Sequence, residues 1–221
     1  MRTSLSSSDL ERYLRLQLDH FFPDGRSTAR LEQVVPRALE RVEHCFARIR
    51  LPAYSTEGAA SFNHLHCDQY ASFLYLASNV AWSECGDVEL ASKLFALNKA
   101  LNGIVCMYDT ILPETFILIH TVGIVLGKAT YGNNLVVCQN ALVGSDRGLA
   151  PVLADGVVIF GGSSVIGDCR IGDHVTLSAG STLLHEAVPP RSIVAGRSPE
   201  LIVKPARRDL VQHYFRLDEP G

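Results

Sequence analysis

The chain has 221 residues, 47% of them apolar, and a formal net charge of -3 at pH 7. A chain of this length can bury one large hydrophobic core or two smaller ones without disulfides or structural metals. Its 20 Lys and Arg residues form no long stripe of one sign, which excludes the charge pattern of a nucleic-acid-binding protein. We therefore expect one or two compact domains, with a small molecule or a second copy of the chain as partner.

The first hundred residues carry apolar side chains at helical spacing. Ser8, three residues before Glu11, predicts a capping box at the start of a first helix. Pro36 predicts a kink or break in the second helix, and Gly103 predicts a C-terminal cap on the fourth. Four or five helices are expected before residue 104, among them helices over residues 8–18, 31–49, 68–82 and 87–102.

The N-terminal segment MRTSLSSSDLERYLRLQ lacks the apolar run of a secretory signal, and no later run reaches the length of about 18 apolar residues that spans a membrane. The sequence therefore predicts a cytoplasmic protein. Its six cysteines form no C-x-x-C pair, which argues against zinc ribbons and thioredoxin-type redox motifs. We expect free thiols, most of them buried.

Beyond residue 116 the apolar pattern has a period of six. Every sixth residue is aliphatic in the series Leu153, Ile159, Val165, Ile171, Leu177 and Leu183. Residues of small or modest volume follow four positions later, at Val157, Ser163, Cys169, Val175 and Ser181. An earlier register, Tyr131, Val137 and Val143, is offset from the first by a four-residue insertion between residues 143 and 153. This period fits neither a helix nor a plain hairpin sheet.

A parallel β-helix accounts for a period of six. Each hexad supplies one short strand and a corner, three hexads complete a triangular coil, and every sixth side chain points inward. Backbone groups pair between coils, so unpaired sheet edges occur only at the two ends. The predicted fold class is α+β, with an N-terminal helical domain over residues 1–113, a hexapeptide-repeat β-helix over 114–204 and a short C-terminal helix within 205–221.

Segments in and around the repeat are similar to the motifs of one enzyme family. HTVGIVLGKA is similar to the block H-A-T-G-I-V-I-G-E, VVCQNALVGS stands in the place of S-I-L-Q-S-V-T-L-G-G, and VPPRSIVAGRSPELIVKP is similar to an ending V-P-P…A-G-x-P-A-x-I-V…K-P. Over residues 104–205 the chain thus resembles the hexapeptide-repeat acyltransferases, and among them the serine O-acetyltransferases. The resemblance implies a left-handed coil, a homotrimer that can pair into a dimer of trimers, acetyl-CoA as co-substrate and no metal.

His120 lies in the middle of the apolar stretch FILIHTVGIVLG. Taken alone, it is better explained as a histidine that satisfies its ring nitrogens inside a core. O-acetylation, however, needs a base near neutral pH to take a proton from the attacking hydroxyl, and imidazole is the side chain that titrates there. The resemblance implies that His120 is this base and that an upstream aspartate orients it; we favour Asp109 over Glu114.

The resemblance also implies contacts to the acceptor. Asp68 stands where the family has an aspartate that contacts the acceptor's amino group, with an N-cap role as the alternative. Arg147 is the strong charge that could bind a substrate carboxylate through two hydrogen bonds. Two departures argue against L-serine: Ile119 replaces an aspartate beside the catalytic histidine, and a second family histidine falls at or near Ala150.

Positions without bulky side chains predict the acetyl-CoA site, in the groove between neighbouring coils of two subunits. For each small residue, turning a corner of the coil is the alternative explanation. The candidate cofactor-binding residues are Gly161, Gly162, Ser178, Ala179, Ala195, Gly196, Arg197 and Lys204, the last as a charge for a phosphate.

The sequence predicts a CoA-dependent O-acetyltransferase that acts on L-serine or a closely related amino acid. The nearest alternative is an acetyltransferase for the hydroxyl or amine of a sugar, nucleotide sugar or specialised metabolite. A metal-dependent β-helix hydratase and a non-catalytic scaffold are further alternatives, although His64 and His66 beside Cys67 lack a fourth spaced zinc ligand. The ending FRLDEPG lacks the terminal isoleucine with which the family docks into a cysteine synthase, so we expect no such complex.

Overall fold

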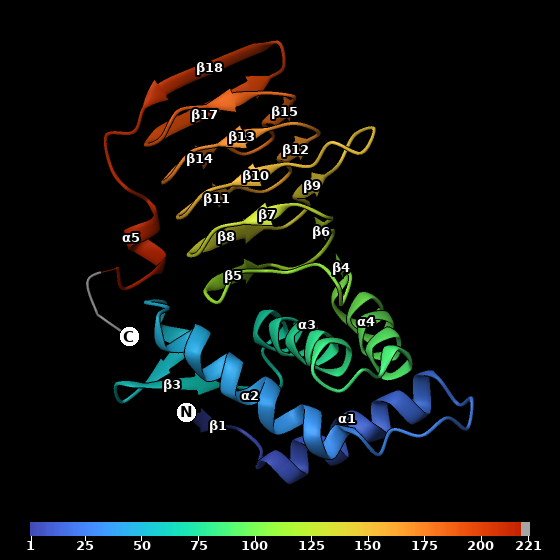
Figure 1. Ribbon diagram of the computed structural model, residues 1–221. Coiled ribbons are helices and arrows are strands. Elements are labelled where there is room, and N and C mark those ends of the chain that lie inside the picture. Colours follow the sequence, from blue (N-terminus) through green and yellow to red (C-terminus); the bar gives the residue numbers. More distant parts are fainter. Residues whose placement is uncertain (218–221) are drawn as a thin grey trace.

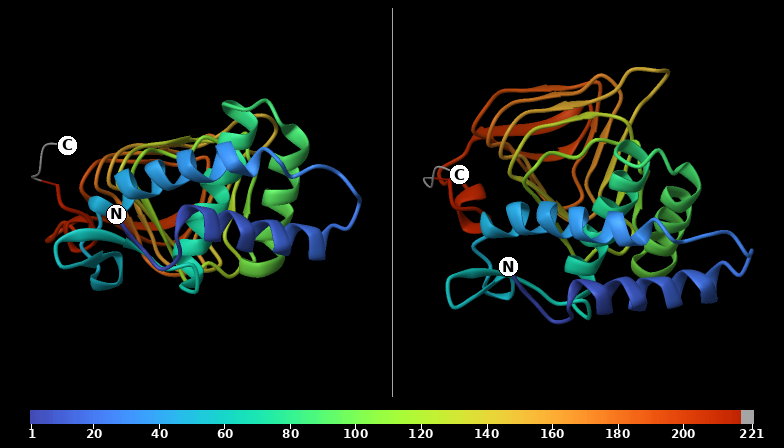
Figure 2. Two further views of the ribbon diagram at one scale, coloured as in Figure 1. Left: turned by 90° about the horizontal axis from the view of Figure 1, so that it is seen from below. Right: turned by 60° about the horizontal axis from the view of Figure 1, so that its bottom comes forward.

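The computed structural model describes residues 1–217 as helices gathered at one end of a parallel β-solenoid (Figure 1). Two further views show the helices lying across the open end of the first coil, with the C-terminal segment running along the outside of the solenoid (Figure 2). The last four residues of the predicted C-terminal tail lie outside the described residues. None of the helices in the described part has the length and apolarity that a membrane crossing requires.

Four α-helices form most of the N-terminal part: α1 (Ser7–Phe21), α2 (Leu31–Ala47), α3 (Cys67–Ser83) and α4 (Val88–Asn102). Gly103 caps α4 with φ of 66°, as its position predicts. The capping box predicted at Ser8 is wrong. Ser6 is the N-cap, because its hydroxyl accepts the Asp9 N–H at 3.1 Å and donates to the Asp9 carboxylate at 2.7 Å. The helix α2 continues through Pro36 without a break.

A small three-stranded sheet beside α2 and α3 was missed from the sequence. It consists of β1 (Arg2–Thr3), β2 (Ser55–Thr56) and β3 (Ala59–Phe62), preceded by the 3-10 turn η1 (Pro52–Tyr54). Strands of two to four residues contain too few alternating positions to show a period of two.

The solenoid has three faces of parallel strands, and each strand pairs with its equivalents one coil away. The first face holds β5 (Phe116–Ile119), β8 (Leu135–Cys138), β11 (Val158–Ile159), β14 (Thr176–Leu177) and β17 (Ser192–Arg197). The second holds β4 (Val105–Cys106), β6 (Val125–Leu126), β9 (Leu142–Gly144), β12 (Ser164–Ile166) and β15 (Thr182–Leu184). The third holds β7 (Thr130–Tyr131), β10 (Val152–Leu153), β13 (Arg170–Ile171) and β16 (Ala187–Val188). An antiparallel strand, β18 (Glu200–Pro205), pairs with β17 at the far end.

The six-residue period is confirmed as a set of three inward-facing columns. Leu153 pairs with Ile171, Ile159 with Leu177, and Val165 with Leu183, and all six are at most 2% exposed. The earlier register continues the same columns, because Tyr131, Val137 and Val143 pair with Leu153, Ile159 and Val165. Burying each such aliphatic side chain contributes about 1.5–3 kcal/mol, so the columns account for much of the solenoid's stability.

The helical part is fixed to the first coil by buried contacts. The Tyr75 hydroxyl on α3 donates to the Thr110 carbonyl at 2.8 Å and accepts the Leu112 N–H at 2.9 Å. The Cys45 thiol on α2 donates to the Phe116 carbonyl at 3.1 Å. Burial raises the pKa of this thiol to about 12, so Cys45 acts as an uncharged packing residue. These contacts hold α2 and α3 against β5, the strand that leads to His120.

The C-terminal segment returns from the far end of the solenoid to the helices. Its helix α5 (Val211–Tyr214) is a single turn, shorter than the sequence suggests. The Arg50 N–H donates to the Tyr214 carbonyl and the Arg216 N–H to the Arg48 carbonyl, both at 2.8 Å. Val211 and Phe215 are fully buried. The segment therefore covers part of the first face of the solenoid (Figures 1 and 2).

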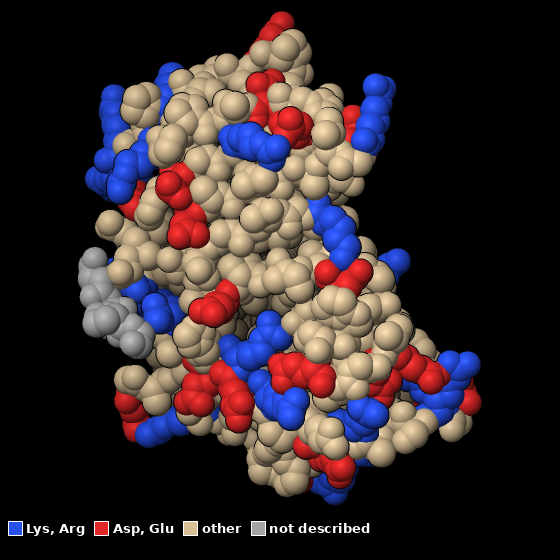
Figure 3. Space-filling model, in the orientation of Figure 1, with Lys and Arg blue, Asp and Glu red and all other residues tan. Residues whose placement is uncertain are grey.

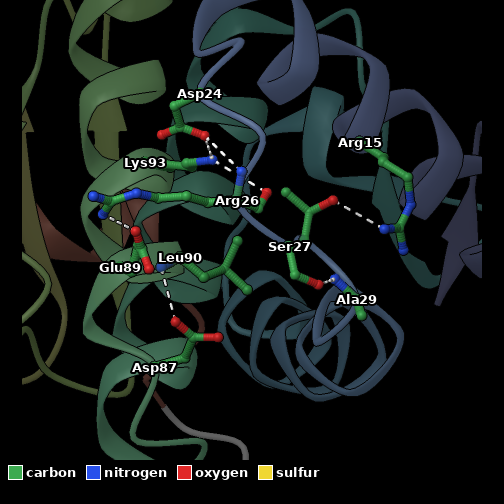
Figure 4. Close-up of polar contacts among 10 residues, drawn as sticks. Arg15, Asp24, Arg26, Ser27, Ala29, Asp87, Glu89, Leu90 and Lys93 are labelled. Atoms are coloured by element: carbon green, nitrogen blue, oxygen red, sulfur yellow. Dashed lines mark hydrogen bonds and ion pairs between the residues drawn. The ribbon is translucent and has the colours of Figure 1, made fainter.

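Acidic and basic side chains are interspersed over the helical part, whereas the visible solenoid face carries fewer charges (Figure 3). One charged cluster joins the α1–α2 connection to α4 (Figure 4). There the Lys93 ammonium lies 2.6 Å from the Asp24 carboxylate, and Arg26 pairs with Glu89. The hydrogen bond from Lys93 lowers the pKa of Asp24.

Candidate functional site

His120 lies at the corner after β5, and its backbone is held by a carboxylate from the helical part. The His120 N–H donates to Asp68 Oδ2 at 3.0 Å, and the Thr121 N–H donates to Asp68 Oδ1 at 3.2 Å. His120 has φ of 53°, a left-handed conformation that costs free energy for a residue with a β-carbon. Both oxygens of one carboxylate thus hold a strained turn that leaves the imidazole exposed to solvent.

Asp68 lies in the first turn of α3, where the sequence left an N-cap role open as the alternative. The N-cap position is His66, and the Asp68 carboxylate reaches across to the solenoid instead. Burial raises the pKa of Tyr54, and the nearby Asp68 carboxylate raises it further. The same two causes raise the pKa of Cys138 to about 11. The corner is therefore assembled from three segments: α3, the turn before β2, and β8 of the next coil.

The two candidate orienting carboxylates have other partners. Asp109 pairs with Lys128 at 2.7 Å, and Lys128 also donates to the Asp109 carbonyl at 2.7 Å. Glu114 pairs with His44 of α2 at 3.5 Å. Within residues 1–217, neither carboxylate makes a hydrogen bond or ion pair with His120. One oxygen of Asp109, Oδ1, is buried without a partner in the described part of the chain, and its role at His120 stays a prediction.

Arg147 lies on a different corner of the solenoid from His120. It follows β9, whereas His120 follows β5 on the preceding face. It has φ of 48° and stands at the tip of a tight turn closed by Asp146 and Leu149. Within one chain the structure does not bring Arg147 and His120 to the same site.

The predicted donor residues form two adjacent columns at the end of the first face. Because Ile159, Leu177 and Val194 are paired, the residues two positions later, Gly161, Ala179 and Gly196, follow one another from coil to coil. Ser178 and Ala195 form the neighbouring column by the same register. A β-carbon at Gly161 would lie 2.8 Å from Gln139 Nε2, so glycine leaves room for that side chain. Gly162, with φ of 73°, turns the corner itself.

A groove of about 650 Å³ lies at the top of these columns, between β17, β18 and the C-terminal segment. Ala195 and Lys204, both predicted, line it together with Arg207 and Arg208, which the sequence analysis did not single out. The cluster KPARR places three basic residues within five positions, a signal that could have pointed to them. Arg197 lies opposite Glu200 in the register of β17 and β18, at the turn between the two strands, and does not line the groove.

The histidines beside Cys67 form no metal centre in the described residues. His64 Nδ1 lies 2.8 Å from the Ser4 hydroxyl, while His66 Nδ1 is buried without a partner among residues 1–217. No group of three or more His, Cys, Asp or Glu side chains in the described ranges could hold a metal ion.

Comparison with known proteins agrees with this architecture. No protein-family model matches the chain. The serine acetyltransferase of Bacillus subtilis is 30% identical over 129 residues, which are 55% of this chain and 59% of that protein. Over about half of its length the chain is similar in sequence to serine acetyltransferases. The chain spans about three-fifths of the length of the Bacillus subtilis protein and less than half of the length of its relatives from Bacillus licheniformis and Escherichia coli.

Solved serine acetyltransferase structures share the fold over most of the chain. The Neisseria gonorrhoeae enzyme in complex with serine matches with a TM-score of 0.67 at 24% identity, covering 91% of this chain and 84% of that one. A serine acetyltransferase in complex with CoA matches with a TM-score of 0.66 at 17% identity, covering 86% and 82%. The predicted order of a helical part, a parallel β-solenoid and a short C-terminal helix is thereby confirmed.

Proposed function

We propose that this protein is a CoA-dependent O-acetyltransferase that transfers acetyl from acetyl-CoA to the hydroxyl of L-serine or a closely related amino acid. The observation that carries the proposal is the anchoring of the His120 corner by both oxygens of Asp68. A histidine that only packed in the core would not need an exposed, left-handed position fixed by a carboxylate from another domain.

In the proposed reaction, His120 takes the proton of the acceptor hydroxyl as the oxygen attacks the thioester carbonyl. The tetrahedral intermediate collapses as the carbon–sulfur bond breaks, and the imidazolium returns the proton to the CoA thiolate. The amides of His120 and Thr121 donate to Asp68, so they are not free to stabilise the oxyanion. The amide of Val122 has no acceptor among residues 1–217, and we assign this role to it.

The donor would lie along the outside of the first face. Lys204, Arg207 and Arg208 at the groove suit the phosphates of CoA. From the row of Ala195 to the row of Ile119 there are four steps between strands, about 19 Å at the usual spacing. An extended pantetheine arm is long enough to cover this distance. A solved serine acetyltransferase in complex with CoA shares this fold, which supports CoA as the ligand.

The acceptor site would be completed by a second copy of the chain. If Arg147 binds the acceptor carboxylate, it must come from a neighbouring subunit, because it projects from another corner than His120. The family resemblance implies that this neighbour belongs to a homotrimer. A different acceptor, the hydroxyl or amine of a sugar or specialised metabolite, is favoured by one observation: Ile119 beside His120 supplies no charge for an amino group.

A thiol-release assay with acetyl-CoA and a panel of acceptors tests the proposal. The panel contains L-serine, L-homoserine, L-threonine and nucleotide sugars. Release with L-serine or a close relative supports the amino-acid acceptor, and release with a nucleotide sugar alone supports the alternative. No release with any acceptor, together with no acetyl-CoA binding by calorimetry, would contradict the proposed function and favour a non-catalytic scaffold.

A further inference from the structure

The connection between β9 and β10 is a small hairpin that leaves the hexad repeat. The Asp146 N–H donates to the Leu149 carbonyl at 2.9 Å, and the Leu149 N–H returns to the Asp146 carbonyl at 2.8 Å. Between them, Arg147 and Gly148 both have positive φ, 48° and 82°, the pattern of a tight two-residue hairpin turn. Figure 1 shows this connection projecting from the solenoid, with Arg147 at its tip by sequence.

His185, which follows β15 two coils further along the solenoid, bridges this hairpin to the solenoid. Its Nδ1 accepts the Asp168 N–H at 3.0 Å. That contact leaves the proton on Nε2, which lies 3.0 Å from Asp146 Oδ2 and donates to it. The Asp168 carboxylate faces away to Arg170, 2.7 Å distant. One ring therefore joins a backbone amide of the solenoid to the first residue of the hairpin turn.

The ring of His185 is held against a glycine. A β-carbon at Gly167 would lie 2.4 Å from His185 Cε1, so no larger residue fits beneath the ring. His185 itself has φ of 55°, which fixes the direction from which its side chain leaves the corner. The hairpin therefore contacts the His185 ring, and the ring in turn packs against Gly167. These contacts limit the movement of the ring and of the hairpin.

A second histidine has the same construction with a different partner. His174 has φ of 55°, and a β-carbon at Gly156 would lie 3.0 Å from its Nδ1. Its ring lies 2.8 Å from the Asp209 carboxylate in the C-terminal segment, not from the hairpin. His174 is thus a matched control for the removal of a corner histidine.

We propose that His185 is a positioning residue: it locks the 145–150 hairpin through Asp146 and so places Arg147 for the carboxylate of the acceptor. The acceptor half of this inference rests on the proposed function. The locking half does not, because it concerns the mobility of the hairpin alone. The ligand class is a small molecule with a carboxylate, which a guanidinium binds through two hydrogen bonds.

Limited proteolysis tests the lock without any enzyme assay. Trypsin cleaves after Arg147 only when the hairpin opens into an extended chain, and Arg147 lies at an exposed tip. In His185→Ala the rate of cleavage between residues 147 and 148 should rise about threefold to fivefold, the effect of losing one exposed charge-assisted hydrogen bond. His185→Gln, which can still accept and donate, should restore most of the protection. His174→Ala should leave cleavage at this bond unchanged.

Steady-state kinetics test the acceptor half. His185→Ala should raise KM for the acceptor by a similar factor and leave KM for acetyl-CoA unchanged. In an Arg147→Ala background the His185→Ala change should add nothing, because the residue that it positions is gone. Equal cleavage rates in wild type and His185→Ala would overturn the lock. Faster cleavage with an unchanged acceptor KM would overturn the claim that His185 places Arg147 for the acceptor. An inactive wild-type protein would overturn the proposed function, but the proteolysis would still test whether His185 holds the hairpin.

Discussion

The corner after β5 and the corner after β8 make the same turn of the solenoid with different numbers of residues. Ile119 pairs with Cys138 before the turn, and Val125 pairs with Leu142 after it. Residues 120–124 therefore form the first corner, whereas the three residues 139–141 form the equivalent corner of the next coil. The shorter corner turns at Asn140, whose φ is 57°. The longer corner turns at Gly123 and adds a second left-handed residue, His120.

The repeat determines the shape of the coil, and the interruptions of the repeat hold the residues suited to chemistry. The extra length at the first corner places His120 outside the wall, where Asp68 holds it. The insertion after β9 places Arg147 at the tip of a hairpin that His185 holds. Neither residue is needed to complete a coil, because the other coils turn without an equivalent.

The largest effect on stability is expected from the shared columns. Leu177 is fully buried between Ile159 and Val194. Leu177→Ala should lower the free energy of unfolding by about 2–5 kcal/mol, through lost burial and the cavity left behind. Urea unfolding measures this loss, and Val203→Ala at an exposed position is the control. A loss below about 1 kcal/mol would mean that the columns are not the main support of the solenoid.

Asp68→Ala tests the difference between the two corners directly. It removes the acceptor of two backbone N–H groups and leaves the strained turn unsupported. We expect a fall in acetyl transfer of about 10- to 100-fold, as is usual when a group that orients a catalytic base is lost. Hydrogen exchange at the amides of His120 and Thr121 should become faster. Exchange at Gly180, whose amide donates to the Gly161 carbonyl on a distant corner, should not change. Equal acceleration at both corners would indicate general loosening instead.

The basic groove should affect the donor alone. Lys204→Ala and Arg208→Ala should each weaken acetyl-CoA binding about threefold to tenfold, because each removes a cation from the groove proposed to bind the CoA phosphates. The effect should shrink as salt is raised, since the groove is open to water. Calorimetry with CoA measures it, with Arg12→Ala on the exposed face of α1 as the control. Unchanged affinity in both variants would move the donor away from this groove.

The smallest effect is expected far from both corners, at Asp24. Its pKa is lowered, first by the hydrogen bond from the Lys93 ammonium, so the folded state favours the charged carboxylate. This contribution is present above the ordinary aspartate pKa of about 3.9 and is lost as the pH falls through the lowered value. Asp24→Asn should therefore lower Tm by a few degrees at pH 7 and match the wild type in strong acid. A constant difference at all pH values would exclude the ion pair as its cause.

The solenoid could be predicted because the same pattern of apolar residues recurs in every hexad. Six aliphatic residues in one register give both the columns and their pairing. The site could be predicted only where a motif marks it, as at His120. Asp109 shows the limit: its pairing with Lys128 depends on how the first coil turns, and the extra residues of that corner cannot be placed by counting hexads.

Contacts between distant segments were not predicted. His185 and Asp146 are 39 positions apart, and nothing in either local sequence marks them as partners. Arg208 lies in a short basic cluster whose importance depends on the return of the C-terminal segment across the first face. The small sheet of β1, β2 and β3 was missed because its strands are too short to show a pattern.

The rate of acetyl transfer by His120→Asn tests whether His120 is the catalytic base. Asparagine tolerates the left-handed conformation of this position, as Asn140 does on the next coil, so the corner should keep its shape. We predict an unchanged urea midpoint and a fall in transfer of about 100- to 10,000-fold, the usual contribution of a general base. A His120→Asn protein that transfers acetyl at the wild-type rate would contradict the assignment of His120 as the catalytic base.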